Sequence, residues 1–399
     1  MQVSSPAPRG RWWSGALALV ASVGLAAAPA ALAHSRAPGH SHRHAPADHH
    51  SHPIHRALGE FAQRKLVADT PGAAELTDPD VVNAWALSFG PASSAWVSDA
   101  GTGKSTLYRG GVGSSAVSKV PITVSVPGGV PTGQVFNGTD GFVISSGSAS
   151  GAPRFLFASG TGVISGWNEN VPAANSMQAE PALTVPGAAF TGLAISGDRL
   201  YAADFHNAAV DVWDSGFNPV KDAGAFRDRK LPAGYAPFGI EATDGQVVVT
   251  YALQDANAQF DVPGAGHGFV DVYSTSGRLL QRLATRGPLN SPWGIAQAPQ
   301  DFGDASGALL IGNFGDGRIQ AYDAKNSRFL GQLGDAHHKA VTIPGLWALK
   351  FGNGVIGAPN ALLFTAGPAK GTHGLFGELT VATRSSAPTQ PSAPTTPGS

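Results

Sequence analysis

Cysteine is absent from this chain of 399 residues, and charged residues make up only 13% of it. Without thiols, the protein has no disulfide bond, no thiolate metal ligand, no cysteine nucleophile and no lipid-modified cysteine anchor. The formal net charge is −1, so no excess of lysine and arginine predicts binding to nucleic acid or to a membrane surface. Stability must therefore come from packing, and no polyanionic partner is expected.

Long apolar runs and common catalytic motifs are also missing beyond the N-terminal region. No later stretch approaches the roughly 20 apolar residues that a membrane-spanning helix needs. The chain has no G-x-S-x-G or H-E-x-x-H motif, so serine hydrolase and zincin functions lack their usual sequence support. Residues Gly101–Ser105 end like a phosphate-binding loop but lack the upstream glycine and lead into a predicted strand.

Glycine and proline, by contrast, are abundant at 52 and 30 residues, which indicates many tight turns and few long helices. One phrase also recurs: a small residue or proline, an aromatic residue or threonine, glycine or alanine, then aliphatic residues. Its six occurrences are Asn83–Leu87, Pro131–Val135, Phe190–Ile195, Pro237–Ile240, Pro292–Ala296 and Leu346–Leu349. Their small residues are about 47, 59, 47, 55 and 54 positions apart, close to the roughly 40–50 residues of a four-stranded propeller blade. We therefore predict an all-β, six-bladed β-propeller.

Short segments of alternating apolar and polar residues follow the phrases and are bounded by turn-forming residues. They predict second strands at 95–99, 154–158, 199–204, 246–251, 308–313 and 361–364. They predict third strands at 105–108, 162–167, 209–214, 268–273, 318–323 and 374–379. Because a ring of blades is usually sealed by a strand from one terminus that joins the last blade, we predict that Arg64–Ala68 closes the ring.

The N-terminal region predicts export. Arg9 and Arg11 precede an apolar run, and Ala31-Leu32-Ala33 matches an A-x-A cleavage site. We therefore predict a Sec signal peptide over residues 1–33 and a secreted or periplasmic mature protein without a membrane span.

Residues 34–56 hold eight of the 13 histidines and few large aliphatic side chains, which predicts a disordered segment. Neutral imidazoles at alternating positions suit zinc, copper or nickel, so a divalent metal is the candidate cofactor, although a solubilising linker is the simpler interpretation. The candidate metal ligands are His40, His42, His44, His49, His50 and His52. Residues 384–399 are rich in Pro, Ser and Thr and predict a second disordered segment, which leaves residues 57–383 for the propeller.

One face of the propeller is predicted to gather polar side chains. In each blade, the loop that enters the innermost strand and the hairpin between the second and third strands emerge on the same face. In blade four, this hairpin is enlarged by residues 252–267, and long loops in compact domains are often functional. There, Asp255, Asp261, His206 and His267 are candidate cation ligands or general bases. The candidate binding residues of this face are Asp99, Asp204, His206, Gln254, Asp255, His267, Asn313 and Asp316.

Simpler roles compete for several of these residues. Asp99, Asp204 and Asn313 follow second strands, where such side chains commonly hydrogen-bond the backbone of a tight turn. The loop histidines are typical of solvated positions. Trp85, Trp293 and Trp347 occupy matching positions in three phrases, which favours packing between blades over a stacking platform for a ligand.

Eight phrases occur together in one order: Leu66–Asp69, Thr77–Trp85, Gly192–Ile195, Tyr201–Phe205, Leu231–Phe238, Gly287–Asn290, Gly312–Gly317 and Thr365–Pro368. Over about Arg64 to Val381, the chain thereby resembles an uncharacterised family of exported bacterial propellers with NHL-like blades, some of which carry an exosortase-sorting tail. The resemblance implies the fold and export but no activity, so no catalytic residue is carried over. Because the Pro- and Ser-rich end has no apolar stretch, we expect release rather than retention at the surface.

We therefore expect a secreted module that binds an unknown small molecule or protein through the face with the blade-four insertion. Two alternatives remain open. One is a propeller enzyme, similar to a lyase or a lactonase, with a metal in the central opening. The other is extracytoplasmic metal binding by the histidine-rich segment.

Overall fold

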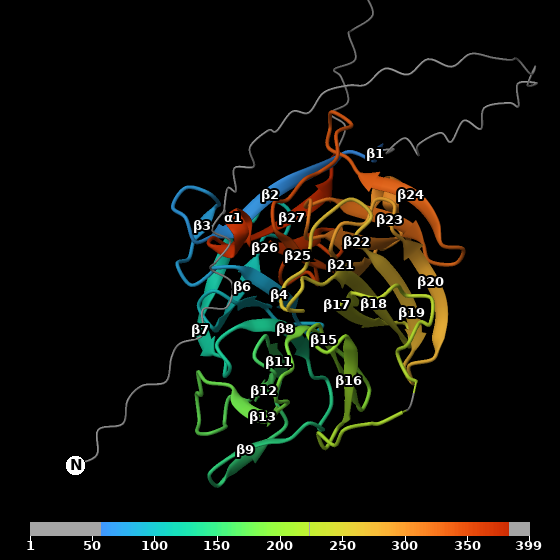
Figure 1. The fold of residues 1–399 in the computed structure, drawn as a ribbon. Coiled ribbons are helices and arrows are strands. Elements are labelled where there is room, and N and C mark those ends of the chain that lie inside the picture. The colour runs from blue at the N-terminus through green and yellow to red at the C-terminus, as the bar shows by residue number, and fades with distance from the viewer. Residues whose placement is uncertain (1–56, 223, 383–399) are drawn as a thin grey trace, which may run out of the picture. The chain divides into compact units, whose positions relative to one another are not determined.

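The recurring phrases form the innermost strands of six sheets, which stand around one axis as the blades of a propeller (Figure 1). The structure is a computed structural model and describes residues 57–222 and 224–382. It confirms the predicted all-β, six-bladed fold. The innermost strands are β4 (Ala84–Ser88), β8 (Pro131–Phe136), β14 (Phe190–Ser196), β17 (Tyr235–Thr243), β21 (Pro292–Gln297) and β25 (Leu346–Phe351).

Blades one, two, four and five each continue outward through three more antiparallel strands. In blade one these are β5 (Ala95–Asp99), β6 (Lys104–Gly110) and β7 (Val117–Ser125). In blade two they are β11 (Phe155–Ser159), β12 (Val163–Trp167) and β13 (Glu180–Thr184), with a hairpin of β9 (Ile144–Ser146) and β10 (Ala149–Gly151) inserted before β11. In blade four they are β18 (Gln246–Leu253), β19 (Phe269–Ser274) and β20 (Leu279–Thr285). In blade five they are β22 (Leu309–Asn313), β23 (Ile319–Asp323) and β24 (Arg328–Leu333), with η1 (Gly303–Ala305) before β22.

The N-terminal part of the described chain closes the ring at blade six, as predicted. After β25, β26 (Leu362–Ala366) and β27 (Leu375–Val381), the outer position belongs to β2 (Phe61–Ala68), which runs antiparallel to β27. Two short strands extend this arrangement: β3 (Leu76–Thr77) beside β2, and β1 (Ala57–Leu58) beside β24 of blade five. The short helix α1 (Pro368–Gly371) lies in the loop between β26 and β27.

Blade three departs from the expected four-stranded plan. Its sheet has only β14, β15 (Arg199–Asp204) and β16 (Ala209–Asp214). The following chain leaves this sheet, and Phe226 packs between blades three and four with its ring 5.6 Å from that of Tyr201 and 5.2 Å from that of Tyr273. Phe226 is only 8% exposed. Burial of this ring accounts for the course of the segment that elsewhere forms the fourth strand.

The tryptophan side chains at the second position of the repeated phrase pack around the axis of the propeller. The rings of Trp85 and Trp347, from blades one and six, stack at 3.6 Å, and the ring of Trp293 meets that of Trp347 edge-on at 5.8 Å. The Nε1–H of Trp293 donates to the backbone oxygen of Thr191 in blade three at 2.8 Å. The three tryptophans therefore pack between blades, as predicted. With Phe238 and Phe314 we call them the axial cluster.

The close approach of neighbouring strands explains the glycine of the phrase. A Cβ atom at Gly239 would lie 2.1 Å from the backbone oxygen of Trp293, and one at Gly294 would lie 2.6 Å from the backbone oxygen of Trp347. Neither contact is sterically possible without displacement of backbone. Glycine recurs in the phrase because adjacent innermost strands approach too closely for a larger residue.

Candidate functional site

The predicted polar face exists as one rim of the propeller. The backbone N–H of Gln254, just after β18, donates to the oxygen of Gly234, just before β17, at 2.8 Å. The N–H of Phe314, after β22, likewise donates to the oxygen of Ser291, before β21, at 3.0 Å. Hairpins between second and third strands therefore lie beside the loops that enter the innermost strands. We call this side the entry rim.

The blade-four insertion begins at residue 254 rather than at the predicted residue 252, because β18 extends to Leu253. The insertion, residues 254–267, is held between two neighbouring blades. Gln254 Nε2 donates to the backbone oxygen of Phe205 in blade three at 2.5 Å, and His206 Nδ1 lies 3.1 Å from the oxygen of Ala258. On the other side, the N–H of Gly264 donates to Oδ1 of Asn290 at 2.7 Å. The insertion is consequently fixed at both sides rather than projecting freely from its own blade.

Several candidate side chains of the entry rim are used to hold local backbone. Asp255 Oδ1 accepts the N–H groups of Gln259 and Phe260 at 2.8 and 3.2 Å. His267 Nδ1 lies 2.8 Å from the oxygen of Val262, and Asp316 Oδ1 accepts from the N–H of Arg318 at 3.2 Å. Within residues 57–222 and 224–382, no three His, Cys, Asp or Glu side chains lie close enough together to hold a metal ion.

Asp204 and Asn313 occupy the capping positions suggested by their place after second strands. Asp204 Oδ1 accepts from the N–H groups of Ala189 and Asn207 at 3.1 and 3.2 Å. Asn313 Nδ2 donates to the oxygen of Pro288 at 2.8 Å. Both side chains are buried. In blades three and five, these hydrogen bonds connect the hairpin after the second strand to the loop that precedes the innermost strand.

Asp261 has a different environment from the other acidic residues of the insertion. Its Oδ2 atom is buried and forms no hydrogen bond of normal geometry, although the hydroxyl of Ser291 is close enough to act on the carboxyl group. Burial raises the pKa of Asp261 to about 6, against the opposing effect of Ser291. This carboxyl group therefore changes charge in a mildly acidic range.

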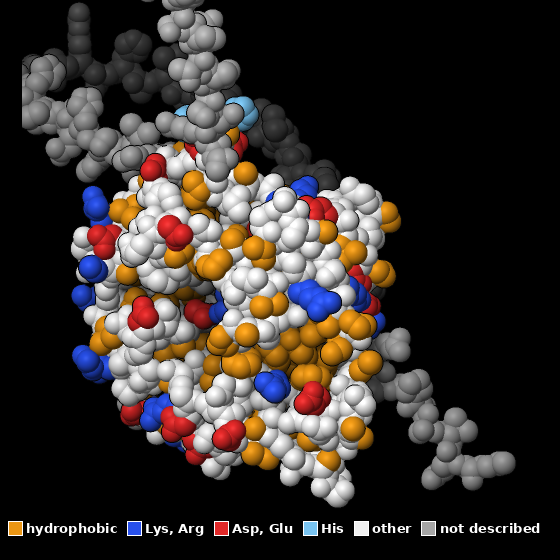
Figure 2. Space-filling model, turned by 180° about the vertical axis from the view of Figure 1, so that it is seen from behind, with side chains coloured by type: hydrophobic (Ala, Val, Ile, Leu, Met, Phe, Trp, Pro, Cys, Tyr) orange, Lys and Arg blue, Asp and Glu red, His pale blue; other side chains and the backbone are white. Residues whose placement is uncertain are grey.

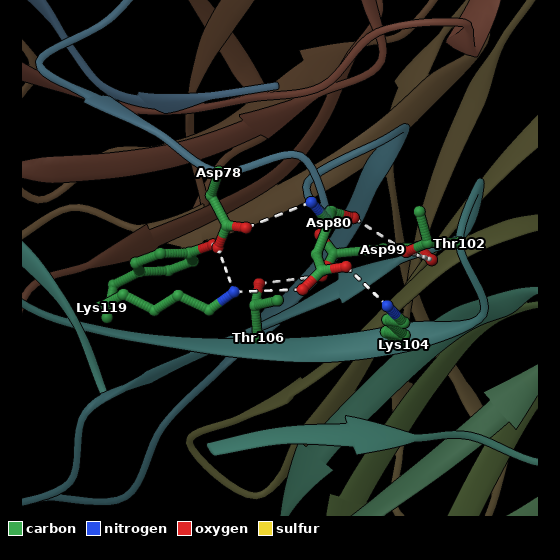
Figure 3. A network of polar contacts seen from close by, with 8 residues as sticks. Asp78, Asp80, Asp99, Thr102, Lys104, Thr106 and Lys119 are labelled. Carbon is green, nitrogen blue, oxygen red and sulfur yellow. Dashed lines mark hydrogen bonds and ion pairs between the residues drawn. The ribbon is translucent and has the colours of Figure 1, made fainter. Parts of the chain in front are cut away.

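Asp99 lies in a polar network at the entry rim of blade one (Figure 3). Its Oδ2 accepts from the hydroxyl of Thr106 at 2.8 Å, while Oδ1 is buried without a partner. Burial raises the pKa of Asp99 well above its usual range, with the Thr106 hydrogen bond acting in the opposite direction. Asp99 therefore does not hydrogen-bond the backbone of a tight turn, unlike the simple expectation for this position.

Two lysines and two further aspartates complete the network (Figure 3). Lys119 Nζ lies 2.7 Å from Asp78 Oδ2 and 3.1 Å from Asp80 Oδ2. Lys104 Nζ lies 2.6 Å from Asp80 Oδ1, and the hydroxyl of Tyr108 donates to Asp78 at 2.5 Å. The network links the loop after β3 to three strands of blade one. No role was predicted for these residues from the sequence, although Asp78 and Asp80 are two positions apart, the spacing of a paired acidic motif.

The opposite face carries a depression around the axis, lined by aliphatic side chains and by polar groups that include Gln134 and Glu241. Figure 2, seen from the side opposite to Figure 1, shows hydrophobic side chains gathered near the middle of this face. The depression encloses about 360 Å³, including space open to solvent. At its mouth, Lys350 Nζ and Glu241 Oε1 lie 3.5 Å apart and join blades six and four. Its aliphatic lining comprises Leu87, Leu193, Ile240, Ile295 and Leu349.

The remaining predictions fall partly outside this structure. His40, His42, His44, His49, His50 and His52 lie outside the described residues. So do the predicted signal peptide and the Pro- and Ser-rich end. Among the described residues, no helix has the length and apolar character needed to cross a membrane.

Comparison with known proteins finds relatives in a virus. No protein-family model matches the chain. Uncharacterized protein R648 of Acanthamoeba polyphaga mimivirus is 31% identical over 338 residues, covering 81% of this chain and 81% of the viral protein. Uncharacterized protein L690 of the same virus is 30% identical over 288 residues, covering 70% of this chain and 75% of its own. These relatives are viral, whereas the sequence resemblance pointed to exported bacterial proteins.

Several solved structures align with this chain at TM-scores below 0.5. The PQQ-bound aldose sugar dehydrogenase of Streptomyces coelicolor aligns with a TM-score of 0.47 and 13% identity, covering 81% of this chain and 98% of its own. Streptogramin B lyase aligns with a TM-score of 0.46 and 11% identity over the same shares of the two chains. The WD40 propeller domain of Doa1 aligns at 0.44 and 9%, covering 79% and 97%. Their names describe different functions, and none transfers to this chain.

Proposed function

The chain belongs to the family of the uncharacterised mimivirus proteins R648 and L690, and from this premise we propose that it is an exported binding module that takes a small molecule or a protein at the entry rim. The observation that carries this proposal is the fixed position of the blade-four insertion between blades three and five. A loop that is already ordered loses less conformational entropy on binding than a mobile one. The insertion also presents the exposed polar side chains of Asn257 and Gln259.

The polar groups of the entry rim support binding better than catalysis. Asp255, His267 and Asp316 each hold nearby backbone, so their geometry serves the loops that carry them. The axial cluster occupies the middle of the ring, where the alternative metal-dependent lyase or lactonase would need its ion. A candidate general base must also lie within hydrogen-bonding reach of a substrate proton. The arrangement favours recognition by a preformed surface.

Variants on the two faces test the binding proposal. In the double variant Asn257→Arg with Gln259→Arg, bulk and charge are added to the insertion without removal of the side-chain contacts that hold it. The matched control, Gln246→Arg, alters an exposed residue of the same blade in the hairpin between β17 and β18, on the opposite face. A small-molecule screen by thermal shift and protein capture with mass spectrometry identify ligands of the unmodified protein.

We expect each specific ligand to lose at least tenfold in affinity with the double variant and to retain its affinity for the control. Ligands that respond only to Gln246→Arg would place the binding surface on the opposite face and overturn the proposal. The metal alternative has a separate test. One equivalent of tightly bound ion in protein restricted to residues 57–383 would favour the enzyme.

The histidine-rich segment offers a third test, which concerns residues outside the described chain. If it acts in metal binding, deletion of residues 34–56 removes zinc or copper binding from the mature protein, because these residues include the alternating histidines. Isothermal titration with each metal measures this. Unchanged binding after the deletion would assign the segment the role of a linker.

A further inference from the structure

Blade three has an open outer edge. After β16 the chain returns beside it only near the end of the strand, where Pro219 pairs with Trp213 and the N–H of Val220 donates to the oxygen of Val212 at 2.8 Å. Residues two apart in a strand turn their backbone groups to the same side. The N–H groups of Val210 and Val212 and the carbonyl of Val210 therefore face outward, and within residues 57–222 and 224–382 they have no hydrogen-bond partner from the protein.

A carboxyl group without a partner lies on the same strand. Asp211, between Val210 and Val212, is partly buried and forms no ion pair or hydrogen bond through its side chain within the described part of the chain. Burial, with a smaller contribution from Asp204, raises the pKa of Asp211 to about 6. A partly buried carboxylate without a cation is unfavourable, and a bound cation would relieve it.

The same position in blade four has the partner that Asp211 lacks. Val210-Asp211-Val212-Trp213 of β16 corresponds to Val270-Asp271-Val272-Tyr273 of β19. In blade four the fourth strand β20 pairs Arg282 directly opposite Asp271, and the guanidinium contacts its carboxylate. Blade four therefore indicates that a strand added to blade three would place a basic residue opposite Asp211.

Blade six also joins an acidic residue of its third strand to an arginine of its outer strand, but one position further along the strand, because Gly377 occupies the place of Asp271. Glu378 of the third strand, β27, pairs opposite Arg64 of the closing strand β2, and their Oε1 and Nη1 atoms lie 3.1 Å apart. Two complete blades thus join a carboxylate of the third strand to an arginine of the outer strand. In blade six, moreover, that outer strand comes from a distant part of the chain, which shows that a blade of this protein accepts a strand that does not follow it in sequence.

We propose that the edge formed by Ala209–Asp211 binds one end of an extended segment of a partner protein, which adds a short antiparallel fourth strand to blade three and places an arginine or lysine opposite Asp211. The backbone N–H and carbonyl groups of Val210 supply hydrogen bonds that do not depend on the partner's sequence, whereas Val220 already lies beside Val212. Asp211 supplies the selection for a basic residue at one position. This surface is on the outside of the ring and is separate from the entry rim.

Protection of the edge is the competing role of Asp211. Charged residues on outer strands often prevent pairing with other chains. In that case Asp211→Asn would promote self-association of the protein and would not change the binding of any basic peptide. The contact with Arg282 in blade four favours the docking role, because there the equivalent carboxylate lies inside a paired sheet.

The probe is a fluorescein-labelled, C-terminally amidated peptide with the sequence of β20, Leu-Leu-Gln-Arg-Leu-Ala-Thr. Its matched control carries Glu in place of Arg. Fluorescence anisotropy with the full mature chain measures both dissociation constants, and hydrogen exchange followed by NMR reports on the N–H group of Val210. The variant Asp211→Arg reverses the charge, while Asp271→Asn removes the carboxylate of the corresponding residue inside a complete blade.

We expect the Arg peptide to bind at least tenfold more tightly than the Glu peptide and to slow exchange at Val210. Asp211→Arg should reverse this preference, and Asp271→Asn should leave it unchanged. Circular dichroism and melting temperature establish that each variant is folded. Equal binding of the two peptides, protection elsewhere in the chain, or self-association through this edge without peptide binding would each overturn the proposal.

Discussion

Replacement of Asp261 by Asn should stabilise the protein near neutral pH but hardly at pH 4. The substitution keeps the shape of the side chain and removes its negative charge. In the folded protein, burial raises the pKa of Asp261 to about 6, while the ordinary value is 3.8. The folded state therefore binds this proton more tightly than the unfolded state. The resulting stabilisation is complete below pH 3.8 and is lost as the pH rises to about 6.

The magnitude follows from the difference between the two pKa values. A difference of about 2.2 units corresponds to about 3 kcal/mol that the ionised group costs above pH 7. At pH 4 the same calculation leaves about 0.5 kcal/mol. Because Asp261 is partly exposed as a residue, these values are upper limits. We expect Asp261→Asn to gain between about 1 and 2.5 kcal/mol more at pH 7.5 than at pH 4.

Urea denaturation at pH 4.0 and 7.5, followed by intrinsic tryptophan fluorescence, measures the free energy of unfolding of both proteins. Comparison of the variant with the unmodified chain at each pH cancels the contributions of other titrating groups. Asp255→Asn is the matched control on the same insertion, since Asp255 accepts two backbone N–H groups and should gain no stability when its charge is removed. A gain for Asp261→Asn that is the same at both pH values would refute the reasoning.

Three further substitutions test the packing described above. Phe226→Ala removes a ring that is 8% exposed between blades three and four and should reduce the free energy of unfolding in urea by about 3 kcal/mol; a loss below 0.5 kcal/mol would contradict its role in directing the chain away from blade three. Gly294→Ala should lower the melting temperature because its Cβ would lie 2.6 Å from backbone, whereas Gly160→Ala, whose nearest contact would be 3.6 Å, serves as control; equal melting temperatures would disprove the proposed steric need for glycine. Arg64→Ala leaves the buried Glu378 without its cation and should cost about 2 kcal/mol in urea unfolding, accompanied by faster hydrogen exchange in β2 and β27; unchanged exchange there would argue against a contribution to ring closure.

Most of the scaffold could be predicted because its signals are local and repeated. The glycine, aromatic and aliphatic positions of the phrase recur wherever an innermost strand lies against its neighbours, as Gly239 and Gly294 show. The closing strand was also predictable, since Arg64–Ala68 is a short segment ending in three apolar residues before the first phrase and the ring requires one outer strand from a terminus. The fourth strand of blade three was not, because the sequence after β16 does not reveal that Phe226 buries its ring between two blades.

The candidate site was predictable in its location but not in its contacts. The length of the blade-four insertion indicated an unusual feature of the entry rim, and the structure places it there between two blades. Whether Asp255 and His267 approach one another depends on backbone conformation within the insertion, where each holds its own neighbours. The network of Asp78, Asp80 and Lys119 was missed because its members are brought together by a loop and an outer strand nearly 40 positions apart in sequence.

The amino-acid sequence by itself determined the number of blades, the position of their innermost strands and the closure of the ring. Those features depend on a pattern of residue types at short spacing, because each blade repeats one local plan. The tertiary structure alone decided which side chains have partners. Trp85, Trp293 and Trp347 pack at the axis, and Asp261 has a buried carboxylate oxygen. Asp211 lies on an outer strand without a cationic partner, whereas Asp271, at the same position of the next blade, contacts Arg282. Such differences depend on contacts between distant segments, and equivalent positions in a repeat do not share them.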